Sequence, residues 1–283
     1  MEQTLETTVG TIRLSDTGGS GTPLVLLHGS GSSRRVFARQ LDSVLAQRAR
    51  MIALDLPGHG DSDNAPDPLS AYTLPGLASC VEDVLRQLAI DKAALFGWSL
   101  GGHVAIEMLA RGRAVSGLML TGTPPVPRGL IGMLRGFLPS FDLFLASKPV
   151  FSPRDVDRFV KLCFGASAVS EFHRAVERTD GRLRTVFSQS MLRGEGSDQR
   201  QVVANALVPI HFVNGADDPF VRLSYIAGFQ KNDDPRTTVE TISGAGHAPF
   251  WEQPQTFNTA IGRFLDAVEG HRINGDRRRT AVF

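Results

Sequence analysis

Residues 94–102 read Ala-Leu-Phe-Gly-Trp-Ser-Leu-Gly-Gly, an apolar run followed directly by a serine between glycines. Gly97 and Gly101 lie two residues to either side of Ser99, and a helical pattern begins near residue 100. In such a strand–turn–helix a side chain at either glycine collides with neighbouring backbone, and the turn holds the serine in a strained conformation that exposes its hydroxyl. The stretch therefore predicts a nucleophilic Ser99; a merely structural turn is the alternative.

Short apolar runs recur along the chain on both sides of this turn, at residues 24–27, 51–54, 93–96, 118–120 and 210–213. They are continuously apolar rather than alternating, as strands covered on both faces require, and such strands are usually parallel. Helical patterns accompany them near residues 34–48, 74–89, 100–111, 222–230 and 252–268. This alternation predicts an α/β fold, in which a mostly parallel, twisted sheet is flanked by helices. Residues 3–15 alternate in polarity and predict an antiparallel hairpin at one edge.

The alternation of strand and helix patterns breaks between Pro124 and about Asn205, where helical patterns such as 155–164 and 170–178 dominate. This stretch holds 8 of the 17 phenylalanines, at positions 137, 141, 144, 151, 159, 164, 172 and 187. Because so many rings must be buried, we predict a helical cap over the carboxyl ends of the strands, where open α/β sheets bind their ligands. An insertion with its own small core and no part in binding is the alternative.

These patterns predict the domain organisation of the chain. The core comprises residues 1–123 and 206–269, and the cap comprises residues 124–205. Residues 270–283 are basic and poor in apolar side chains, so they are expected to form a weakly anchored C-terminal tail.

Charge and composition exclude several classes of partner and location. The 30 basic and 29 acidic residues give a formal charge of +1, which argues against a nucleic-acid backbone as the main partner. No apolar run approaches the roughly 20 residues of a membrane-spanning helix, and the N-terminus lacks the regions of a signal peptide. Two cysteines, Cys80 and Cys163, cannot form a disulfide framework. We therefore expect a cytoplasmic protein without membrane or nucleic-acid partners.

A serine hydroxyl needs a base to remove its proton, and His247 is the predicted base. After a serine in such a turn, the acid and then the histidine follow along the chain. His247 lies in the glycine-rich residues 243–250, after the last strand pattern and before the final helix. Of the other histidines, His28 and His103 flank the site as expected hydrogen-bonded scaffold residues, and His59 is expected to be a loop residue.

The acid that orients this imidazole is expected in Gly-Ala-Asp-Asp-Pro at residues 215–219, which follows an apolar run. Both Asp217 and Asp218 are candidates there. The other common location for the acid, after the run at 118–120, reads Thr-Gly-Thr-Pro and holds no carboxylate. That absence supports the site at 217–218.

The negative charge of the transition state needs donors that are already in place, and backbone N–H groups can supply them. Leu100, directly after the nucleophile, offers one N–H group. Ser30, in the loop His-Gly-Ser-Gly at 28–31, offers the second. The Ser30 hydroxyl either contacts the ligand as well or belongs to a plain turn residue of which only the amide is used.

Spacing argues against metal and cofactor chemistry. The chain holds no His-x-His-x-Asp-His or His-Glu-x-x-His pattern, so a hydrolytic metal site is not expected. Arg34 stands where a dinucleotide-binding fingerprint requires its third glycine, and no phosphate-binding P-loop occurs. No cofactor is therefore expected.

Four motifs together resemble the α/β-hydrolase superfamily over about residues 20–268. They are His28-Gly29, Asp-Leu-Pro-Gly-His-Gly-Asp-Ser at 55–62, the serine turn at 97–102 and Gly-His-Ala-Pro-Phe at 246–250. The resemblance implies the α/β-hydrolase fold with its helical cap insertion. It also favours Asp218 over Asp217 as the acid, because similar hydrolases usually place the carboxylate just before the proline.

A narrower resemblance is to the metal-independent, α/β-hydrolase-type N-acylhomoserine lactonases, bacterial quorum-quenching enzymes that open the lactone ring. The matching stretches are 96–103, 120–126, 179–182, 213–215 and 218–221. The resemblance implies a small-molecule acyl lactone or ester substrate that contacts Gly29, Trp98, Phe159 and Phe220. Those lactonases can carry Asn at the position of Ser30, Tyr at that of Phe159 and Glu as the acid.

Three functions follow as hypotheses. The first is hydrolysis of N-acylhomoserine lactones by attack of Ser99 on the ring carbonyl. The second is a general carboxylesterase, or a hydrolase of another acyl substrate, with the same three side chains. The third is a ligand receptor on a hydrolase scaffold, against which the intact set of Ser99, Asp218 and His247 argues.

Overall fold

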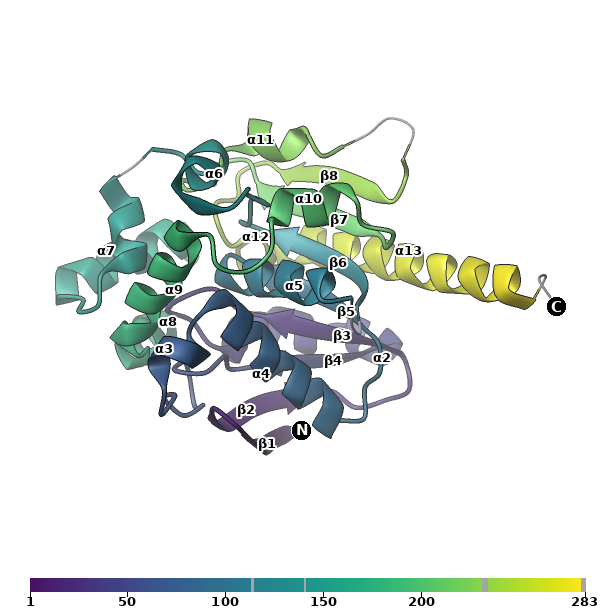
Figure 1. The fold of residues 1–283 in the computed structure, drawn as a ribbon, viewed down its shortest axis with the longest axis horizontal. Helices are drawn as coiled ribbons and strands as arrows, with labels where there is room; N and C mark the ends of the chain where they lie inside the picture. Colours follow the sequence, from purple (N-terminus) through teal and green to yellow (C-terminus); the bar gives the residue numbers. More distant parts are fainter. Residues whose placement is uncertain (113–114, 140, 231–233, 281–283) are drawn as a thin grey trace.

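The computed structural model describes residues 1–112, 115–139, 141–230 and 234–280, in which eight strands form one sheet (Figure 1). The strands are β1 (Glu2–Thr7), β2 (Gly10–Asp16), β3 (Thr22–Leu27), β4 (Ala49–Leu54), β5 (Ala93–Trp98), β6 (Val115–Thr121), β7 (Ile210–Gly215) and β8 (Thr237–Ile242). Their order across the sheet is β1-β2-β4-β3-β5-β6-β7-β8. Six neighbouring strands, β4, β3, β5, β6, β7 and β8, run parallel. Strands β1 and β2 form a hairpin, and β2 pairs antiparallel with β4. The predicted fold class is confirmed.

Strand β5 lies near the middle of the sheet, between β3 and β6. All of its residues are buried, because helices cover both faces of the sheet and leave no polar side to the strand. The serine turn that follows β5 therefore opens at the centre of the carboxyl edge of the sheet. Open α/β sheets bind their ligands at this edge.

Helices cover both faces of the sheet. They are η1 (Arg34–Phe37), α1 (Ala38–Leu41), α2 (Leu45–Arg48), α3 (Pro68–Ala71), α4 (Leu74–Gln87), α5 (Leu100–Ala110), α11 (Leu223–Ala227), α12 (Pro249–Glu252) and α13 (Pro254–Thr280). Figure 1 shows α4 and α5 in front of the sheet, while α13 lies along the other face with Phe264 and Val268 against Gly117 of β6. The helix predicted over 34–48 is divided into the three short helices η1, α1 and α2, and the Ser43 hydroxyl accepts a hydrogen bond from Leu45 N at the start of α2.

Helices also make up the insertion between β6 and β7. They are α6 (Gly129–Gly136), η2 (Phe141–Ser147), α7 (Pro153–Phe164), η3 (Gly165–Ser167), α8 (Ser170–Arg178), α9 (Gly181–Arg193) and α10 (Gln199–Ala204). The described part of residues 124–205 contains no strand, only an isolated bridge at Phe137. Phe164 stacks on Phe172, with ring centroids 4.0 Å apart, and lies 5.4 Å from the Trp98 ring. The insertion therefore packs on the carboxyl end of β5.

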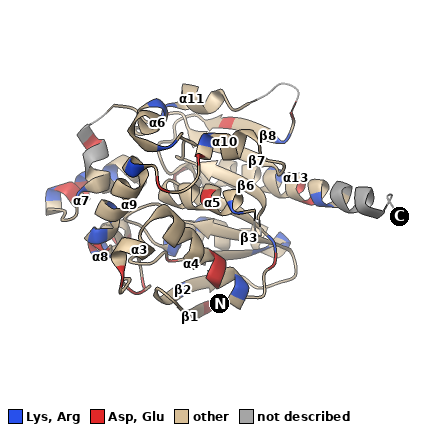
Figure 2. Cartoon of the chain, in the orientation of Figure 1, with Lys and Arg blue, Asp and Glu red and all other residues tan. Residues whose placement is uncertain are grey.

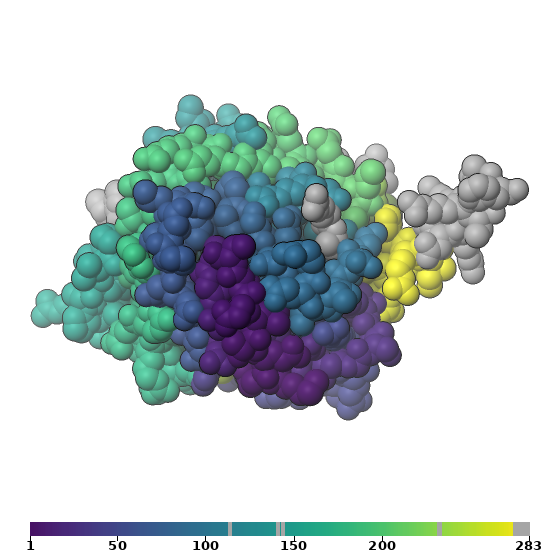
Figure 3. All heavy atoms as spheres, turned by 60° about the horizontal axis from the view of Figure 1, so that its bottom comes forward, coloured from purple at the N-terminus to yellow at the C-terminus, as the bar shows by residue number. Residues whose placement is uncertain are grey.

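The N-terminal hairpin and the C-terminal helix α13 lie at different places on the molecule (Figure 1). Figure 3 shows the hairpin of β1 and β2 at the surface beside α4. Helix α13 extends past the sheet to Thr280, so residues 270–280 continue a helix rather than forming a separate segment (Figure 1).

In the cartoon of Figure 2, the basic and acidic residues of the described ranges are interspersed over the elements of the fold. No helix in the described ranges has the length and apolar character needed to cross a membrane. Cys80 and Cys163 are both buried and unpaired.

Candidate active site

Ser99 has an unusual backbone conformation between β5 and α5. Its φ of 52° and ψ of −118° place it in a region that residues with a side chain rarely occupy. The Ser99 amide donates to Thr121 O at 2.9 Å, and the Thr123 hydroxyl donates to Ser99 O at 3.0 Å. The end of β6 therefore holds the strained turn from both sides, and such strain is typical of functional sites.

The two glycines of the turn are required by close backbone contacts. A Cβ atom at Gly97 would lie 2.5 Å from Gly102 Cα, and one at Gly101 would overlap the carbonyl oxygen of Leu27. Real side chains never approach backbone this closely, so α5 can begin directly after β5 only with glycine at both positions. The steric reason that the sequence suggested is present in the structure.

The structure brings His247 and Asp218 together, although 29 residues separate them. Nδ1 of His247 lies 2.8 Å from Oδ2 of Asp218, and both side chains are almost fully buried. The other carboxylate oxygen, Oδ1, accepts from the amides of Phe220 and Val221 at 2.9 and 3.1 Å. Asp218 is thus held by backbone donors on one side and the imidazole on the other, whereas Asp217 is exposed.

The imidazole of His247 is enclosed by two aromatic rings. Phe220 meets it edge to face, with ring centroids 4.8 Å apart, and the Trp98 ring lies 5.6 Å away. Trp98 Nε1 also donates to His247 O at 2.9 Å. These contacts hold the loop of His247 against the end of β5, beside the serine turn.

Ser99 and His247 both contact the end of β6 or the residues directly after it. Ser99 is bonded to Thr121 and Thr123, and a Cβ atom at Gly122 would lie 2.5 Å from Cε1 of His247. Among the described residues, no hydrogen bond joins Ser99 Oγ to the imidazole. The serine–histidine contact stays a prediction, and catalytic hydrogen bonds often tighten only when substrate is bound.

The loop after β3 passes directly beside the serine turn. A Cβ atom at Gly29 would lie 3.0 Å from Cε3 of Trp98 and 3.2 Å from Cβ of Ser99. The next residue, Ser30, has a buried hydroxyl without a hydrogen-bond partner among the described residues. Leu100, the other predicted donor, is buried at the start of α5. The two amides predicted to bind the oxyanion therefore belong to Leu100, which follows Ser99, and to Ser30, which follows Gly29.

The structure shows where the four residues that the resemblance links to substrate lie. Gly29 and Trp98 contact each other beside Ser99, and Phe220 contacts the imidazole. Phe159, on α7, has its Cε1 atom 3.0 Å from the position of a Cβ at Gly31. Gly29 and Trp98 thus lie beside Ser99, Phe220 lies against His247 and Phe159 lies against the loop after β3. The contact of these four residues with substrate stays a prediction.

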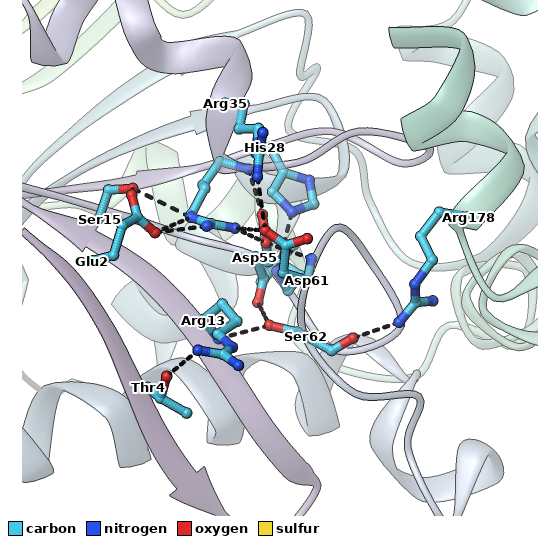
Figure 4. Close-up of polar contacts among 12 residues, drawn as sticks. Glu2, Thr4, Arg13, Ser15, His28, Arg35, Asp55, Asp61, Ser62 and Arg178 are labelled. Atoms are coloured by element: carbon cyan, nitrogen blue, oxygen red, sulfur yellow. Dashed lines mark hydrogen bonds and ion pairs between the residues drawn. The ribbon is translucent and has the colours of Figure 1, made fainter. Parts of the chain in front are cut away.

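Sequence reasoning missed a buried ion-pair network behind this loop (Figure 4). Asp55 is fully buried and pairs with the guanidinium of Arg34, which also binds Asp61 and Glu2. Burial alone lowers the pKa of Arg34, but the three carboxylates outweigh it and raise that pKa, so Arg34 stays charged. The stretch at 55–62 contains Asp55 and Asp61, and these two acids are the feature of the sequence that indicates an ion-pair network.

Comparisons with known proteins show which family and which solved structures the chain resembles. A family model described as "Alpha/beta hydrolase family" matches residues 24–260. Two structures of N-acyl homoserine lactonase AidH variants have TM-scores of 0.90. The complex with N-hexanoyl homoserine is 41% identical and covers 94% of this chain and 97% of its own. The complex with N-hexanoyl homoserine lactone is 40% identical, with 95% and 98% covered.

A curated sequence relative acts on a different ester. The pimeloyl-[acyl-carrier protein] methyl ester esterase of Xanthomonas axonopodis pv. citri is 30% identical over 266 residues, covering 88% of this chain and 97% of its own. The resemblance to the lactonases therefore extends over the whole fold, including the cap, while the resemblance to esterases is more distant. The extent of the family match and these identities together show that the chain belongs to the alpha/beta hydrolase family.

Proposed function

We propose that this protein hydrolyses the ester bond of N-acylhomoserine lactones, with Ser99 as nucleophile. The observation that carries the proposal is the similarity to AidH, at 40% identity over 95% of the chain, cap included. The buried pair of His247 and Asp218 beside the strained Ser99 supports it, because this is the arrangement that serine hydrolases need. Buried, unpaired Cys80 and Cys163 suit a reducing cytoplasm, where we place the enzyme.

The proposed reaction begins with proton transfer from Ser99 Oγ to Nε2 of His247. Asp218 accepts the hydrogen bond from Nδ1, which keeps the proton-accepting nitrogen on the opposite side of the ring. Ser99 Oγ attacks the lactone carbonyl carbon, and the amides of Ser30 and Leu100 stabilise the oxyanion. The ring C–O bond then breaks, and His247 returns the proton to the leaving alkoxide. Water, activated by the same imidazole, hydrolyses the acyl-enzyme.

A lactone sets a particular demand on this site. The leaving alkoxide stays tethered to the acyl group, so ring closure competes with hydrolysis at a high effective concentration. The enzyme must therefore admit water or move the new hydroxyl aside before the ring re-forms. With a small open-chain ester this competing reaction does not arise, because the alcohol that is released diffuses away.

The cap supports an apolar acyl chain as the other half of the substrate. Its phenylalanines Phe159, Phe164 and Phe172 are buried, and Phe164 packs on Trp98 at the carboxyl end of β5. Each CH₂ group transferred from water into such surroundings contributes about 0.8 kcal/mol. We therefore expect kcat/KM to rise roughly fourfold per added methylene until the chain fills the space available.

A substrate panel tests the proposal. N-acylhomoserine lactones of increasing chain length and nitrophenyl esters of the same acyl groups are compared by kcat/KM. The proposal predicts ring opening of the lactones, with efficiency at least equal to that of the matched esters. Lactones left intact over hours while simple esters are cleaved would exclude it.

A general carboxylesterase is the second candidate, and the relationship to the pimeloyl ester esterase favours it. It requires the same Ser99, Asp218 and His247 and the same oxyanion donors. Only the alcohol part of the substrate differs. In the panel above, this candidate predicts high activity on the nitrophenyl esters and none on the lactones.

A further inference from the structure

Two buried histidines that the reaction does not use, His28 and His59, lie directly behind the loop of Ser30. His28 follows β3, and His59 belongs to the loop after β4. Both are completely buried, and their rings meet edge to face with centroids 4.8 Å apart. A buried histidine pair costs free energy unless each polar atom is bonded, so the partners of the four ring nitrogens indicate what the pair does.

Each ring has one carbonyl and one amide as partners. In His28, Nδ1 donates to Gly29 O at 2.8 Å and Nε2 accepts from Leu56 N at 3.0 Å. In His59, Nδ1 donates to Pro57 O at 3.2 Å and Nε2 accepts from Gly31 N at 3.3 Å. An imidazole that donates at one nitrogen and accepts at the other is neutral and has a single tautomer. Burial lowers the pKa of both imidazoles, that of His59 well below 6.5.

These bonds determine the direction of the Ser30 peptide groups. The Gly29 carbonyl and the Ser30 N–H belong to one planar trans peptide, so they point in opposite directions. Because His28 binds the carbonyl, the Ser30 N–H is directed away from the histidines. In the next peptide, His59 binds the Gly31 N–H and thereby turns the Ser30 carbonyl the other way. The Ser30 amide itself makes no hydrogen bond to any described residue.

The loop that carries His59 is itself firmly held. The carboxylate of Asp55 accepts from Arg34 N at 2.6 Å and from Asp61 N at 2.8 Å, besides its ion pair with Arg34 (Figure 4). On the cap side, Asp180 N donates to Gly58 O at 2.9 Å. The loops after β3 and β4 are therefore joined to each other by an ion-pair network, and the loop after β4 is also attached to the cap at Asp180, directly before α9.

We propose that His28 and His59 form a neutral clamp that positions the Ser30 amide for the oxyanion, with His59 as a positioning residue that holds the Ser30–Gly31 peptide through its Nε2 lone pair. This inference rests on the proposed function only in taking Ser30 as an oxyanion donor. The clamp needs a hydrogen-bond acceptor at Gly31 N. It does not need a titrating proton.

The test compares His59→Leu, which removes the acceptor, with His59→Gln, whose side-chain oxygen can still reach Gly31 N. His211→Leu is the matched control, because His211 is buried on β7, 5.3 Å from the Phe264 ring and away from this loop. kcat and KM are measured with a nitrophenyl ester. Binding of phenylboronic acid, whose tetrahedral adduct with serine mimics the oxyanion, is titrated by tryptophan fluorescence and needs no turnover.

We expect His59→Leu to lower kcat at least tenfold and to weaken boronate binding by a similar factor, with KM changed less than twofold. Complete loss of one oxyanion donor lowers kcat by about 10²–10³, so this factor is the largest decrease in kcat that we expect for His59→Leu. His59→Gln should regain most of both losses, and His211→Leu should match the wild type. If His59→Leu does not fold, His59→Asn, whose side chain is too short to reach Gly31 N, replaces it with the same expectation.

The clamp is refuted if the acceptor-free variant binds boronate and turns over ester within twofold of the wild type. It is also refuted if His59→Gln is as impaired as His59→Leu while both are folded. Failure of the proposed function is distinguishable: a wild type that binds boronate and cleaves esters but leaves lactones intact contradicts that function, while the comparison among the His59 variants still decides on the clamp.

Discussion

At the scale of single residues, Ser99 has a strained backbone conformation that hydrogen bonds to neighbouring residues maintain. Its positive φ is held by Thr121 and Thr123, and the neighbouring imidazole is held by Asp218, Trp98 and Phe220. These restraints come from three segments of the chain: the end of β5, the end of β6 with the residues after it, and the loop after β7. The backbone of Ser99 and the imidazole of His247 are therefore each held in place without substrate, and groups held in this way are what electrostatic stabilisation of a transition state requires.

Replacement of Ser99 separates its chemical role from its conformational cost. Both Ser99→Ala and Ser99→Gly should lose at least about 10³ in kcat, because neither offers a nucleophile. Only glycine relieves the positive φ, so Ser99→Gly should be more stable to urea than Ser99→Ala by about 1 kcal/mol. Substantial activity in either variant, measured with a nitrophenyl ester, would refute Ser99 as the nucleophile.

Neutralising the two adjacent carboxylates tests which one serves the imidazole. Asp218→Asn should lower kcat by up to about 10⁴, because an amide in this position favours the wrong tautomer of His247. Asp217→Asn should stay within threefold of the wild type, since its side chain is exposed. The comparison is made on one ester at one pH, and a larger loss in Asp217→Asn would assign the role to that residue.

At the scale of elements, the joint between cap and core depends on a few rings. Phe164, at the end of α7, contacts both Phe172 of α8 and Trp98 of β5. It is 2% exposed, so its whole ring is part of the packing between the two layers. The cap helices α7 and α8 are thus connected to strand β5 at Trp98, the residue just before the proposed nucleophile.

Truncation of this ring should loosen the joint. Phe164→Ala should lower the free energy of unfolding by about 3–5 kcal/mol, as for other large buried aromatic residues. Leu130→Ala on α6 is the control, because Leu130 is 56% exposed and should change stability by less than about 0.5 kcal/mol. Urea unfolding of both variants measures this, and equal stability of the two would contradict the packing described for α7.

Five of the parallel strands could be predicted from the sequence, because each contains a continuous apolar run bounded by turn residues. The sixth, β8, was missed, because its sequence Thr-Thr-Val-Glu-Thr-Ile is only partly buried and not continuously apolar. The helical insertion was predictable as well, since α7 and α8 show clear amphipathic patterns. The division of residues 34–48 into short helices was not, because it depends on local bonds such as that of Ser43. At the site, the residues of the motif were predictable, whereas the network around Asp55 and Arg34 depends on contacts between distant loops.

At the scale of the whole molecule, four buried histidines link stability to pH. Burial lowers the pKa of His28, His59, His103 and His211, the last two to about 4. The unfolded chain, with histidine pKa values near 6.5, binds more protons than the folded chain between pH 4 and 6.5. The free energy of unfolding must therefore fall as the pH is lowered through this window.

The slope of this dependence can be assigned to single groups. Each such histidine contributes up to about 1.4 kcal/mol per pH unit. We expect His211→Leu to have a shallower loss of stability between pH 6.5 and 5 than the wild type, because one of the four groups is removed. Urea unfolding at intermediate pH values measures the slope, and identical slopes in the two proteins would exclude His211 as a contributor.

The central claim is that Ser99 opens the ring of an N-acylhomoserine lactone at its carbonyl carbon. The most direct measurement is mass spectrometry of the product formed from N-hexanoyl homoserine lactone in water enriched in heavy oxygen. The account predicts one ring-opened product that has gained one water, with the heavy oxygen in the new carboxylate, formed by the wild type and not by Ser99→Ala. Unchanged lactone, or release of hexanoic acid with an intact ring, would contradict it.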